Sequence, residues 1–370
     1  MRHDDCKRRG TKKLPKRGAR RVSGVVSLLR DLVQIPSPSR EEGPIVKYLT
    51  DAFETLGWKA VREGKNLYTE LGDEGPLLLL NSHTDTVPVG EGWSHNPLAA
   101  HIVDRKIYGR GSNDAKGCLA AMMYGAFAAF AKNPPKGRVL LAATCEEEIS
   151  GQGLEQLLKI LPKPDAAVVG EPTGLQPAVA QKGLLLLEVI AKGRSAHAAW
   201  GGGVNAVSAA ARDILSLSNV SFDKSHPALG VPSLEVTQAH GGERHNVIPD
   251  RCKMVVDIRT TPTYTPEEII DLVSKKVEGD VEVRSKRLVS VDTDPDHPIV
   301  QAAVAANPGA KPFGSPTVSD WVFLRDIPTV KVGPGDSHRS HTPDEYVTVS
   351  ELEEGAAFYE RLIREYFERA

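Results

Sequence analysis

The sequence predicts an α/β protein with a mixed sheet, helices on both faces of that sheet, and an inserted, smaller α+β domain. Apolar runs alternate with helical patterns along most of the chain, which is typical of sheets covered by helices. With 370 residues, the chain is longer than one hydrophobic core usually organises. The pattern changes after Pro172 and returns near Asp292, so we expect the second domain between these two points.

The main domain is expected to begin with residues 22–176. Apolar residues at helical spacing predict helices over residues 22–34, 42–56 and 117–131. Short apolar runs predict buried strands at residues 77–80, 138–144 and 166–169. Polar side chains directly follow these strands, and open α/β sheets build their sites at such strand ends.

The inserted domain is expected over residues 177–290. Strands are predicted there at residues 184–191 and 253–259, and helices at residues 204–217 and 266–276. The main domain then resumes over residues 291–370, and it ends in a helix predicted over residues 350–368. We expect the inserted domain to act as a lid over the main one.

Composition narrows the class of protein. Hydrophobic residues make up 40% of the chain and charged residues 25%, which is ordinary for a globular protein. The aromatic content of 5% argues against a surface that stacks on nucleic acid or carbohydrate. No apolar stretch approaches the length of a membrane span, so we expect no membrane partner. Four cysteines without Cys-x-x-Cys spacing suit reduced thiols and a cytoplasmic location.

Residues 1–21 form a basic arm. They carry ten Lys or Arg against Asp4 and Asp5, so the arm contributes +8 to the net charge of −2 and the remainder carries about −10. We expect a disordered leader or a mis-assigned start here. No apolar segment follows the arm, so we do not expect a secretory signal. The alternative is contact with nucleic acid or another anionic surface.

Several potential metal ligands follow apolar runs or glycine-rich turns, and they lie far apart in the sequence. Two imidazoles and three carboxylates suit two divalent ions such as zinc, cobalt or manganese, with one carboxylate shared between them. Asp85 stands two residues after the first histidine, on the same side of an extended segment. The candidate ligands are His83, Asp114, Glu147 or Glu148, Glu171 and His341.

Each of these residues has a simpler interpretation when taken alone. A histidine after a strand is often hydrogen-bonded and structural, and an acidic run such as residues 146–148 is often a solvated surface. Three adjacent glutamates directly after the apolar run 139–143 nevertheless repel one another near a core of low dielectric constant. A nearby cation would relieve that repulsion, so the combination favours a metal site.

Eight motifs, in their order along the chain, resemble those of the M20 metallopeptidase family, the group of acetylornithine deacetylase, succinyl-diaminopimelate desuccinylase and related carboxypeptidases. The resemblance covers residues 22–370 and excludes the basic arm. It implies a dinuclear-metal catalytic domain. The motifs are SHTDTVP, YGRGSNDAKG, TCEEEISG, VVGEPT, RSAHAA, HNVIPD, DIR and SHTPDE.

The resemblance also implies a role for each metal-site residue. His83 and Glu171 would hold one ion, while Glu148 and His341 would hold the other. Asp114 would bridge the two ions. Asp85 would accept the other ring N–H of His83, and Glu147 would be the general base.

The same resemblance assigns residues of the inserted domain to the substrate. His197 would stabilise the oxyanion, often from the partner subunit of a homodimer formed through the inserted domain, although it could instead cap the helix that begins near Gly203. Arg259 and Asn246 would hold the α-carboxylate of the substrate, although an arginine at a strand end is often merely solvated. Outside the inserted domain and apart from the resemblance, the run Gly333-Pro334-Gly335 predicts a tight turn at which the substrate could approach the backbone of Gly333 closely.

Some alternatives stay open at this point. His338 could replace His341 as a ligand, and Glu146 stands where relatives commonly have aspartate, so the register of the acidic run is open. Cys145 is interpreted as an inert buried thiol. The expected substrate is a small N-acyl amino acid, with acetylornithine first and succinyl-diaminopimelate or an amino-group carrier protein bearing lysine or ornithine as rivals. A relative that binds amino acids or peptides without catalysis is the other class considered.

Overall fold

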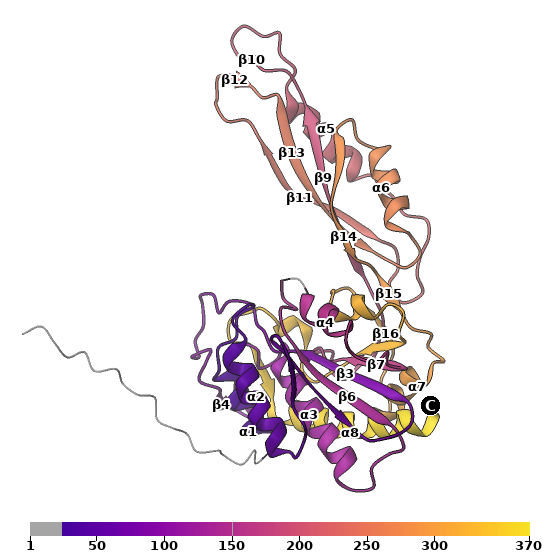
Figure 1. Ribbon diagram of the computed structural model, residues 1–370. Helices are drawn as coiled ribbons and strands as arrows, with labels where there is room; N and C mark the ends of the chain where they lie inside the picture. Colours follow the sequence, from indigo (N-terminus) through magenta and orange to yellow (C-terminus); the bar gives the residue numbers. More distant parts are fainter. Residues whose placement is uncertain (1–23, 150) are drawn as a thin grey trace, which may run out of the picture.

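The computed structural model describes residues 24–149 and 151–370, so the predicted basic arm lies outside the described residues. Two units built on separate sheets make up the molecule (Figure 1). The larger unit contains a nine-stranded sheet in the order β1-β2-β6-β3-β7-β17-β8-β15, with β16 beside β8. Its strands are β1 (Val61–Glu63), β2 (Asn66–Leu71), β3 (Leu77–His83), β6 (Arg138–Thr144), β7 (Ala166–Val169), β8 (Ala178–Gln181), β15 (Val291–Asp292), β16 (Phe313–Ser315) and β17 (Thr329–Lys331).

Four parallel strands, β6, β3, β7 and β17, form the centre of this sheet, and antiparallel pairs on either side make it mixed. Strand β3 is apolar along most of its length because both of its faces are covered. Leu78 and Leu80 pack in a core with the long helices, while Leu77 and Leu79 pack against short helices on the opposite face. The predicted mixed sheet with helices on both faces is therefore confirmed.

The helices of the larger unit are unequal on the two faces. Helices α3 and α8 pack against each other, and α1 and α7 pack beside them. The opposite face is covered by α4 and the 3₁₀ helix η1. Helix α3 is apolar all round and is buried as its Ala- and Met-rich sequence predicts. The bounds are α1 (Val25–Val33), α2 (Gly43–Thr55), α3 (Lys116–Ala131), α4 (Gln152–Leu157), α7 (Pro298–Ala306), η1 (Asp320–Leu324), η2 (Ser337–Arg339) and α8 (Val349–Arg369).

The smaller unit projects from the larger one and carries its own hydrophobic core (Figure 1). Its four-stranded antiparallel sheet has the order β11-β13-β9-β14. The paired short strands β10 and β12 lie at the end farthest from the larger unit. The elements are β9 (Gly183–Lys192), β10 (Ala196–His197), α5 (Ala206–Leu217), β11 (Ser233–Gly241), β12 (Val247–Ile248), β13 (Arg251–Thr260), α6 (Pro266–Ser274) and β14 (Asp280–Leu288).

The boundary between the units differs from the predicted insertion at residues 177–290. Strand β8 lies inside that predicted range, yet it pairs with β17 and β15 of the larger sheet. The smaller sheet therefore starts at Gly183, where β9 begins. The predicted boundary followed the change in sequence pattern after Pro172. Strand β8 has only four residues and is buried on both faces, so its sequence shows no periodicity that would indicate to which sheet it belongs.

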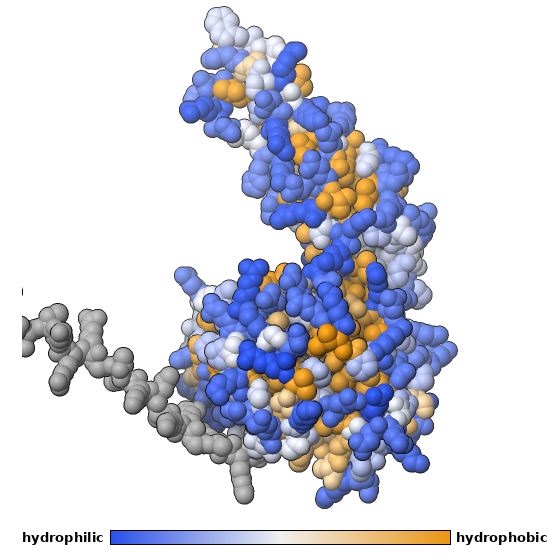
Figure 2. Space-filling model, viewed as in Figure 1, coloured by the Kyte–Doolittle hydropathy of each residue, from blue (hydrophilic) through white to orange (hydrophobic). Residues whose placement is uncertain are grey.

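A third sheet of three short strands lies on the larger unit, in the order β18-β5-β4. It supports the turn that leads into α3. Figure 2 shows a hollow between the two units on one side of the molecule. Among the described residues, no helix is long and apolar enough to cross a membrane. The remaining strands are β4 (His101–Val103), β5 (Lys106–Tyr108) and β18 (Tyr346–Thr348).

Candidate metal centre

Three neighbouring parallel strands deliver polar side chains to one edge of the large sheet. His83 is the last residue of β3, Glu171 follows β7, and the acidic turn at residues 146–148 follows β6. Because β3 pairs with both β6 and β7 in parallel, their carboxyl ends meet at the same edge. Asp114 reaches this edge from the turn before α3, and His341 from the loop after η2.

The first group of candidate ligands contains His83, Asp114 and Glu171. The Nε2 atom of His83 lies 3.3 Å from Oδ1 of Asp114 and 3.9 Å from Oε1 of Glu171. Only 2% of the His83 side chain is exposed, and 12–14% of the two carboxylates. All three ligand atoms lie within 4.8 Å of one another, a spacing that one cation could fill.

The second group contains Asp114, Glu148 and His341. The Nε2 atom of His341 lies 3.0 Å from Oε2 of Glu148 and 3.6 Å from Oδ2 of Asp114. These ligand atoms also lie within 4.8 Å of one another. Asp114 therefore presents Oδ1 to the first group and Oδ2 to the second, as a carboxylate shared by two cations must.

Glu345 holds the shared aspartate in place. Its Oε1 atom accepts the main-chain N–H groups of Asn113 and Asp114, each at 3.0 Å. Its Oε2 atom forms a buried ion pair with Arg110 at 2.6 Å. The peptide bond between Asp114 and Ala115 is cis. Glu345 is not among the predicted site residues, although it is the last residue of the SHTPDE motif.

Asp85 is completely buried, and it holds the acidic turn as well as the neighbouring histidine. Its carboxylate accepts the main-chain N–H of Glu147 at 3.1 Å and that of Glu148 at 3.2 Å. The ring Nδ1–H of His83 has a nearer acceptor in the main-chain oxygen of Asp85, at 3.0 Å, than in the carboxylate, at 3.6 Å. The predicted bond to the carboxylate is thus secondary to a main-chain bond, because the chain turns directly after β3.

The charges at this edge are poorly balanced without cations. Burial raises the pKa of Glu171 to about 8, and the nearby Asp114 carboxylate adds to the shift. Burial also raises the pKa of Glu147 well above its usual value, with contributions from Glu171, Asp320 and Glu148 against His83. A set of two imidazoles and several crowded carboxylates fits two divalent ions such as zinc or cobalt, whose charge would relieve this repulsion.

The structure decides two of the open alternatives by geometry. The side chain of His338 is 95% exposed and bonded to Asp336, so it lies outside both ligand groups, whereas His341 lies within one. Glu148, not Glu146, faces His341. Cys145 is buried, and burial with the nearby Glu42 carboxylate raises the pKa of its thiol to about 12, as expected for an inert cysteine.

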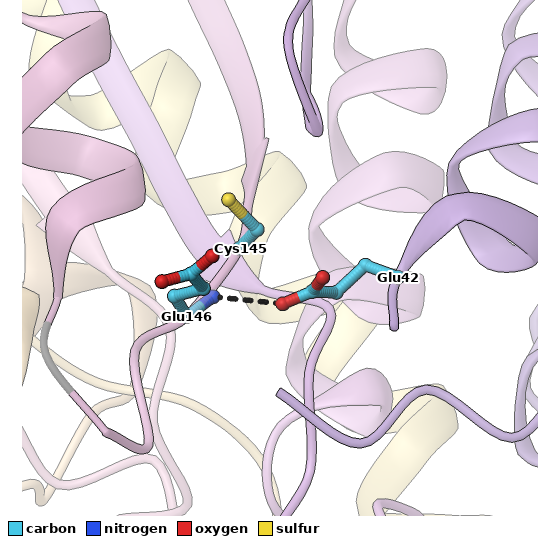
Figure 3. A group of neighbouring side chains, drawn as sticks. All are labelled: Glu42, Cys145 and Glu146. Carbon is cyan, nitrogen blue, oxygen red and sulfur yellow. Dashed lines mark hydrogen bonds between the residues drawn. The ribbon is translucent and has the colours of Figure 1, made fainter. Parts of the chain in front are cut away.

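A third group of possible ligands lies beside the acidic turn and contains Glu42, Cys145 and Glu146. Figure 3 shows the Glu42 carboxylate facing the main chain of Glu146, while the thiol of Cys145 points away. The ammonium of Lys65 lies 3.1 Å from Glu42 Oε2 and 3.6 Å from Glu146 Oε1. This group therefore already contains its cation and is a poor candidate for a metal.

Of the predicted substrate residues of the inserted unit, His197 and Asn246 lie close together, whereas Arg259 lies apart from them within one chain. His197 lies in β10, at the far end of the smaller unit (Figure 1), and the main chain of the nearby Asn246 accepts the N–H of Ala198. Arg259 lies at the other end of the sheet, where its side chain is paired with Asp257 at 2.8 Å. The helix after residue 203 is capped by Asn205, so the alternative that His197 caps it is wrong.

Gly333 is buried behind the metal-site edge. A Cβ atom there would lie 2.7 Å from the Cys118 thiol, 2.7 Å from the main-chain oxygen of Glu171 and 2.9 Å from the Tyr359 hydroxyl. The close approach at this glycine is therefore between packed elements of the protein. The absence of a side chain at Gly333 is thus explained by packing within the protein, whereas the prediction explained it by close approach of the substrate.

Comparisons with known proteins agree with this architecture. The model of peptidase family M20/M25/M40 matches residues 79–365. An acetylornithine deacetylase from Shigella sonnei is 29% identical over 87% of this chain and 92% of its own length. A succinyl-diaminopimelate desuccinylase from Methylorubrum populi is 28% identical over 92% of this chain and 98% of its own length.

Solved structures show the same fold. An M20 family metallo-carboxypeptidase from Sulfolobus solfataricus is 21% identical with a TM-score of 0.74, over 93% of this chain and 99% of that one. A dinuclear metal binding M20 peptidase from Bacillus subtilis is 19% identical with a TM-score of 0.72, over 94% and 98% of the two chains. The chain therefore belongs to peptidase family M20/M25/M40 and is a metal-dependent hydrolase that acts on amide bonds.

Proposed function

We propose that this hydrolase removes the acyl group from a small N-acyl amino acid, with acetylornithine as the foremost substrate. The observation that carries the proposal is the position of Asp114 between two ligand groups, with Glu147 beside them. The names of two relatives, a deacetylase and a desuccinylase, indicate the same substrate class. Succinyl-diaminopimelate and an amino-group carrier protein bearing lysine or ornithine are the alternatives.

The metal centre would consist of two ions, zinc first and cobalt second. His83 and Glu171 would hold one ion, Glu148 and His341 the other, and Asp114 both. Such ions supply Lewis acidity and lower the pKa of a bound water molecule. Glu345 and Asp85 would keep the ligands in register through the main-chain bonds described above.

Glu147 is assigned the proton transfers. Its main-chain N–H is held by Asp85 at 3.1 Å, and its carboxyl group is not a member of either ligand group. It would accept a proton from the attacking water and then donate it to the nitrogen of the leaving amine, after which the amide C–N bond breaks. A positioned general base of this kind contributes about 10²–10⁴ in rate.

The remaining substrate contacts are assigned to two chains of a homodimer. The register of β13 against β9 pairs Arg251 with Lys192 at one end and Arg259 with Leu184 at the other. The eight steps along the strand from Arg251 to Arg259 span about 26 Å, so the Arg259 end and the tip with His197 and Asn246 cannot reach one small carboxylate together. We assign Arg259 to the substrate of its own chain, and His197 and Asn246 to the substrate of the partner.

The proposal is tested by metal analysis and a substrate panel. The purified protein, loaded with zinc or cobalt, is assayed against N-acetyl-L-ornithine, N-succinyl-diaminopimelate and other N-acyl amino acids. We expect two ions per chain and the fastest turnover on the acetyl substrate. In Glu147→Ala, the two ions should remain while turnover falls by about 10²–10⁴. Absence of acetylornithine turnover would reject the leading substrate, and full activity of Glu147→Ala would reject the assigned base.

A further inference from the structure

The acidic turn at residues 146–148 is held from outside by two buried carboxylates. Asp85 accepts the main-chain N–H groups of Glu147 and Glu148. Glu42, which is also 0% exposed, accepts the main-chain N–H of Glu146 at 3.2 Å through Oε1. All three N–H groups of the turn therefore end on side-chain carboxylates rather than on the backbone.

Glu42 is held firmly in this position. Its Oε1 atom also accepts the main-chain N–H of Arg40 at 2.9 Å, and its Oε2 atom forms the ion pair with Lys65 at 3.1 Å. Figure 3 shows the carboxylate of Glu42 directed at the Glu146 nitrogen. The ammonium of Lys65 therefore compensates the charge of the buried carboxylate.

The turn needs such a restraint because Glu146 has a φ of +57°. Residues with a side chain rarely adopt the left-handed region, and they persist there only when surrounding contacts fix them. The bond from Glu146 N–H to Glu42 fixes the residue directly before Glu147. A change in φ at this point would rotate the following peptide and with it the Glu147 side chain.

The simplest structural interpretation of Glu42 is that it caps helix α2. Glu42 occupies the N-cap position, but its side chain accepts no hydrogen bond from the N–H groups of that helix. Its bonds go instead to Arg40, Glu146 and Lys65. The same segment also supports the second carboxylate, since Ser39 donates a hydrogen bond to Oδ2 of Asp85 at 2.7 Å.

We propose that Glu42 is a positioning residue for the hydrolytic reaction, which fixes the direction of the Glu147 carboxyl through the Glu146 main chain. This inference rests on the proposed function of Glu147 as the general base. Glu42 touches neither ligand group and acts on catalysis only through the turn. Small displacements of a reacting group, of about 1 Å, can cost about 10²-fold in rate.

The test starts with Glu42→Ala, assayed on the N-acyl amino acid that the panel shows to be turned over fastest. We expect two ions per chain as in the wild type, an unchanged KM, and kcat lowered about 10–100-fold. Asp213→Ala is the matched control. Asp213 is a buried carboxylate that likewise accepts two main-chain N–H groups, those of Glu278 and Gly279, but it lies in the smaller unit. The Asp213→Ala variant should have a lower melting temperature, while its kcat stays within about twofold of the wild type.

A double-mutant cycle separates positioning from a general structural effect. If Glu42 acts through Glu147, Glu42→Ala should cause no further loss in a Glu147→Ala background, because coupled residues are not additive. An equal loss in both backgrounds, or a kcat of Glu42→Ala within about twofold of the wild type, would overturn the inference. Full activity of Glu147→Ala alone would instead reject the proposed base, so the two failures are distinguishable.

Glu42→Gln covers the case in which the alanine variant does not fold. Glutamine keeps the Oε1 acceptor for Glu146 and loses only the charge, so it is combined with Lys65→Met to leave the local net charge unchanged. We expect kcat of this double variant within about threefold of the wild type. A loss of tenfold or more in a folded, metal-loaded double variant would show that the acceptor is not what matters and would contradict the inference.

Discussion

The edge of the large sheet and the tip of the smaller unit carry the two halves of the proposed active site, and they are built differently. At the sheet edge, His83 and Asp85 are at most 2% exposed, and hydrogen bonds fix most of the polar side chains there. At the tip, His197 and Asn246 are exposed, and the neighbouring Trp200 is 87% exposed. The two-residue strands β10 and β12 are all the sheet that supports them.

The difference indicates which half is complete within one chain. A buried, hydrogen-bonded cluster is already organised for the charges that develop in the reaction, and it costs little to use. Exposed side chains on a short ribbon gain their environment only when another surface covers them. In the proposed dimer, the tip is the part of the site that a second copy of the chain would cover.

Replacing Asp114 should have the largest effect, because both ligand groups share it. Asp114→Ala is expected to reduce the metal content to at most one ion per chain and to lower turnover by about 10³-fold or more, since several kcal/mol of charge stabilisation is lost. Metal analysis and steady-state kinetics check this. His338→Ala is the control, since His338 lies three residues before His341 but outside both groups. If Asp114→Ala retained two ions, the assignment of Asp114 as the shared carboxylate would be contradicted.

Replacing His197 tests the tip. His197→Ala should keep both ions and lower kcat by about 10²–10³-fold, the usual loss of one oxyanion donor. An exposed histidine of the larger unit, His101, provides the control, because His101→Ala should leave kcat unchanged. These two variants separate loss of a donor from a general effect of removing imidazole.

Mixing variants tests whether the tip acts on the partner. Co-expressed Glu147→Ala and His197→Ala chains should recover about a quarter of wild-type activity, because half of the dimers are mixed and each holds one intact site. If His197 acts within its own chain, no mixed dimer holds an intact site and the activity stays low. That result, or a monomer in sedimentation, would contradict the assignment of the tip to a partner.

Arg259 lies between the two regions and should have a smaller effect. A bidentate charge-assisted pair with a carboxylate is worth about 1.5–3 kcal/mol, so Arg259→Ala should lower kcat/KM about 10–150-fold, mainly through KM. The kcat/KM of Arg259→Lys should lie between those of the wild type and Arg259→Ala, because lysine keeps the charge but lacks the forked guanidinium group. Arg284→Ala, on strand β14 of the same sheet, is the control. An unchanged KM in Arg259→Ala would mean that Arg259 does not bind the substrate and only pairs with Asp257.

The sequence predicted the strands that build the site better than it predicted the contacts around it. Strands β6 and β7 agree with the predicted ranges residue for residue, because runs of buried apolar residues leave little ambiguity. Strand β3 continues three residues beyond the prediction, through polar Asn81 and Ser82 to His83. Those residues are buried and bonded to partners far along the chain, which no local pattern reports.

Residues that hold the ligands from a distance were missed for the same reason. Glu42 and Glu345 look like ordinary charged residues in the sequence, and their partners lie 104 and 231 residues away. Arg259 and Asn246 share motifs with relatives, but only the structure shows that Asn246 lies in the connection before β13 and Arg259 near the far end of that strand. Spacing along the chain thus predicts which residues take part, while the fold determines which of them can act together.

Glu351 provides the smallest and most specific test of how firmly the sheet-edge region is held. It pairs with Arg339 at 2.9 Å and receives the N–H of Thr348, which ties the loop before His341 to the start of α8. Although burial raises it, the hydrogen bonds from Arg339 and Thr348 lower the pKa of Glu351. Its stabilising effect is therefore complete above the pKa of the unfolded chain, near 4.3, and is lost as the pH falls through the lower folded value.

Glu351→Gln should consequently lower the free energy of unfolding by about 1 kcal/mol at pH 7 and by little at pH 3, because only the ionised carboxylate makes these contacts strong. Urea unfolding of metal-free protein at both pH values measures the difference. Glu353→Gln, two residues along on the exposed face of α8, should change the stability by less than about 0.5 kcal/mol throughout. A loss of equal size at both pH values would mean that Glu351 acts by packing, and the loop that carries His341 would then be anchored by shape rather than by charge.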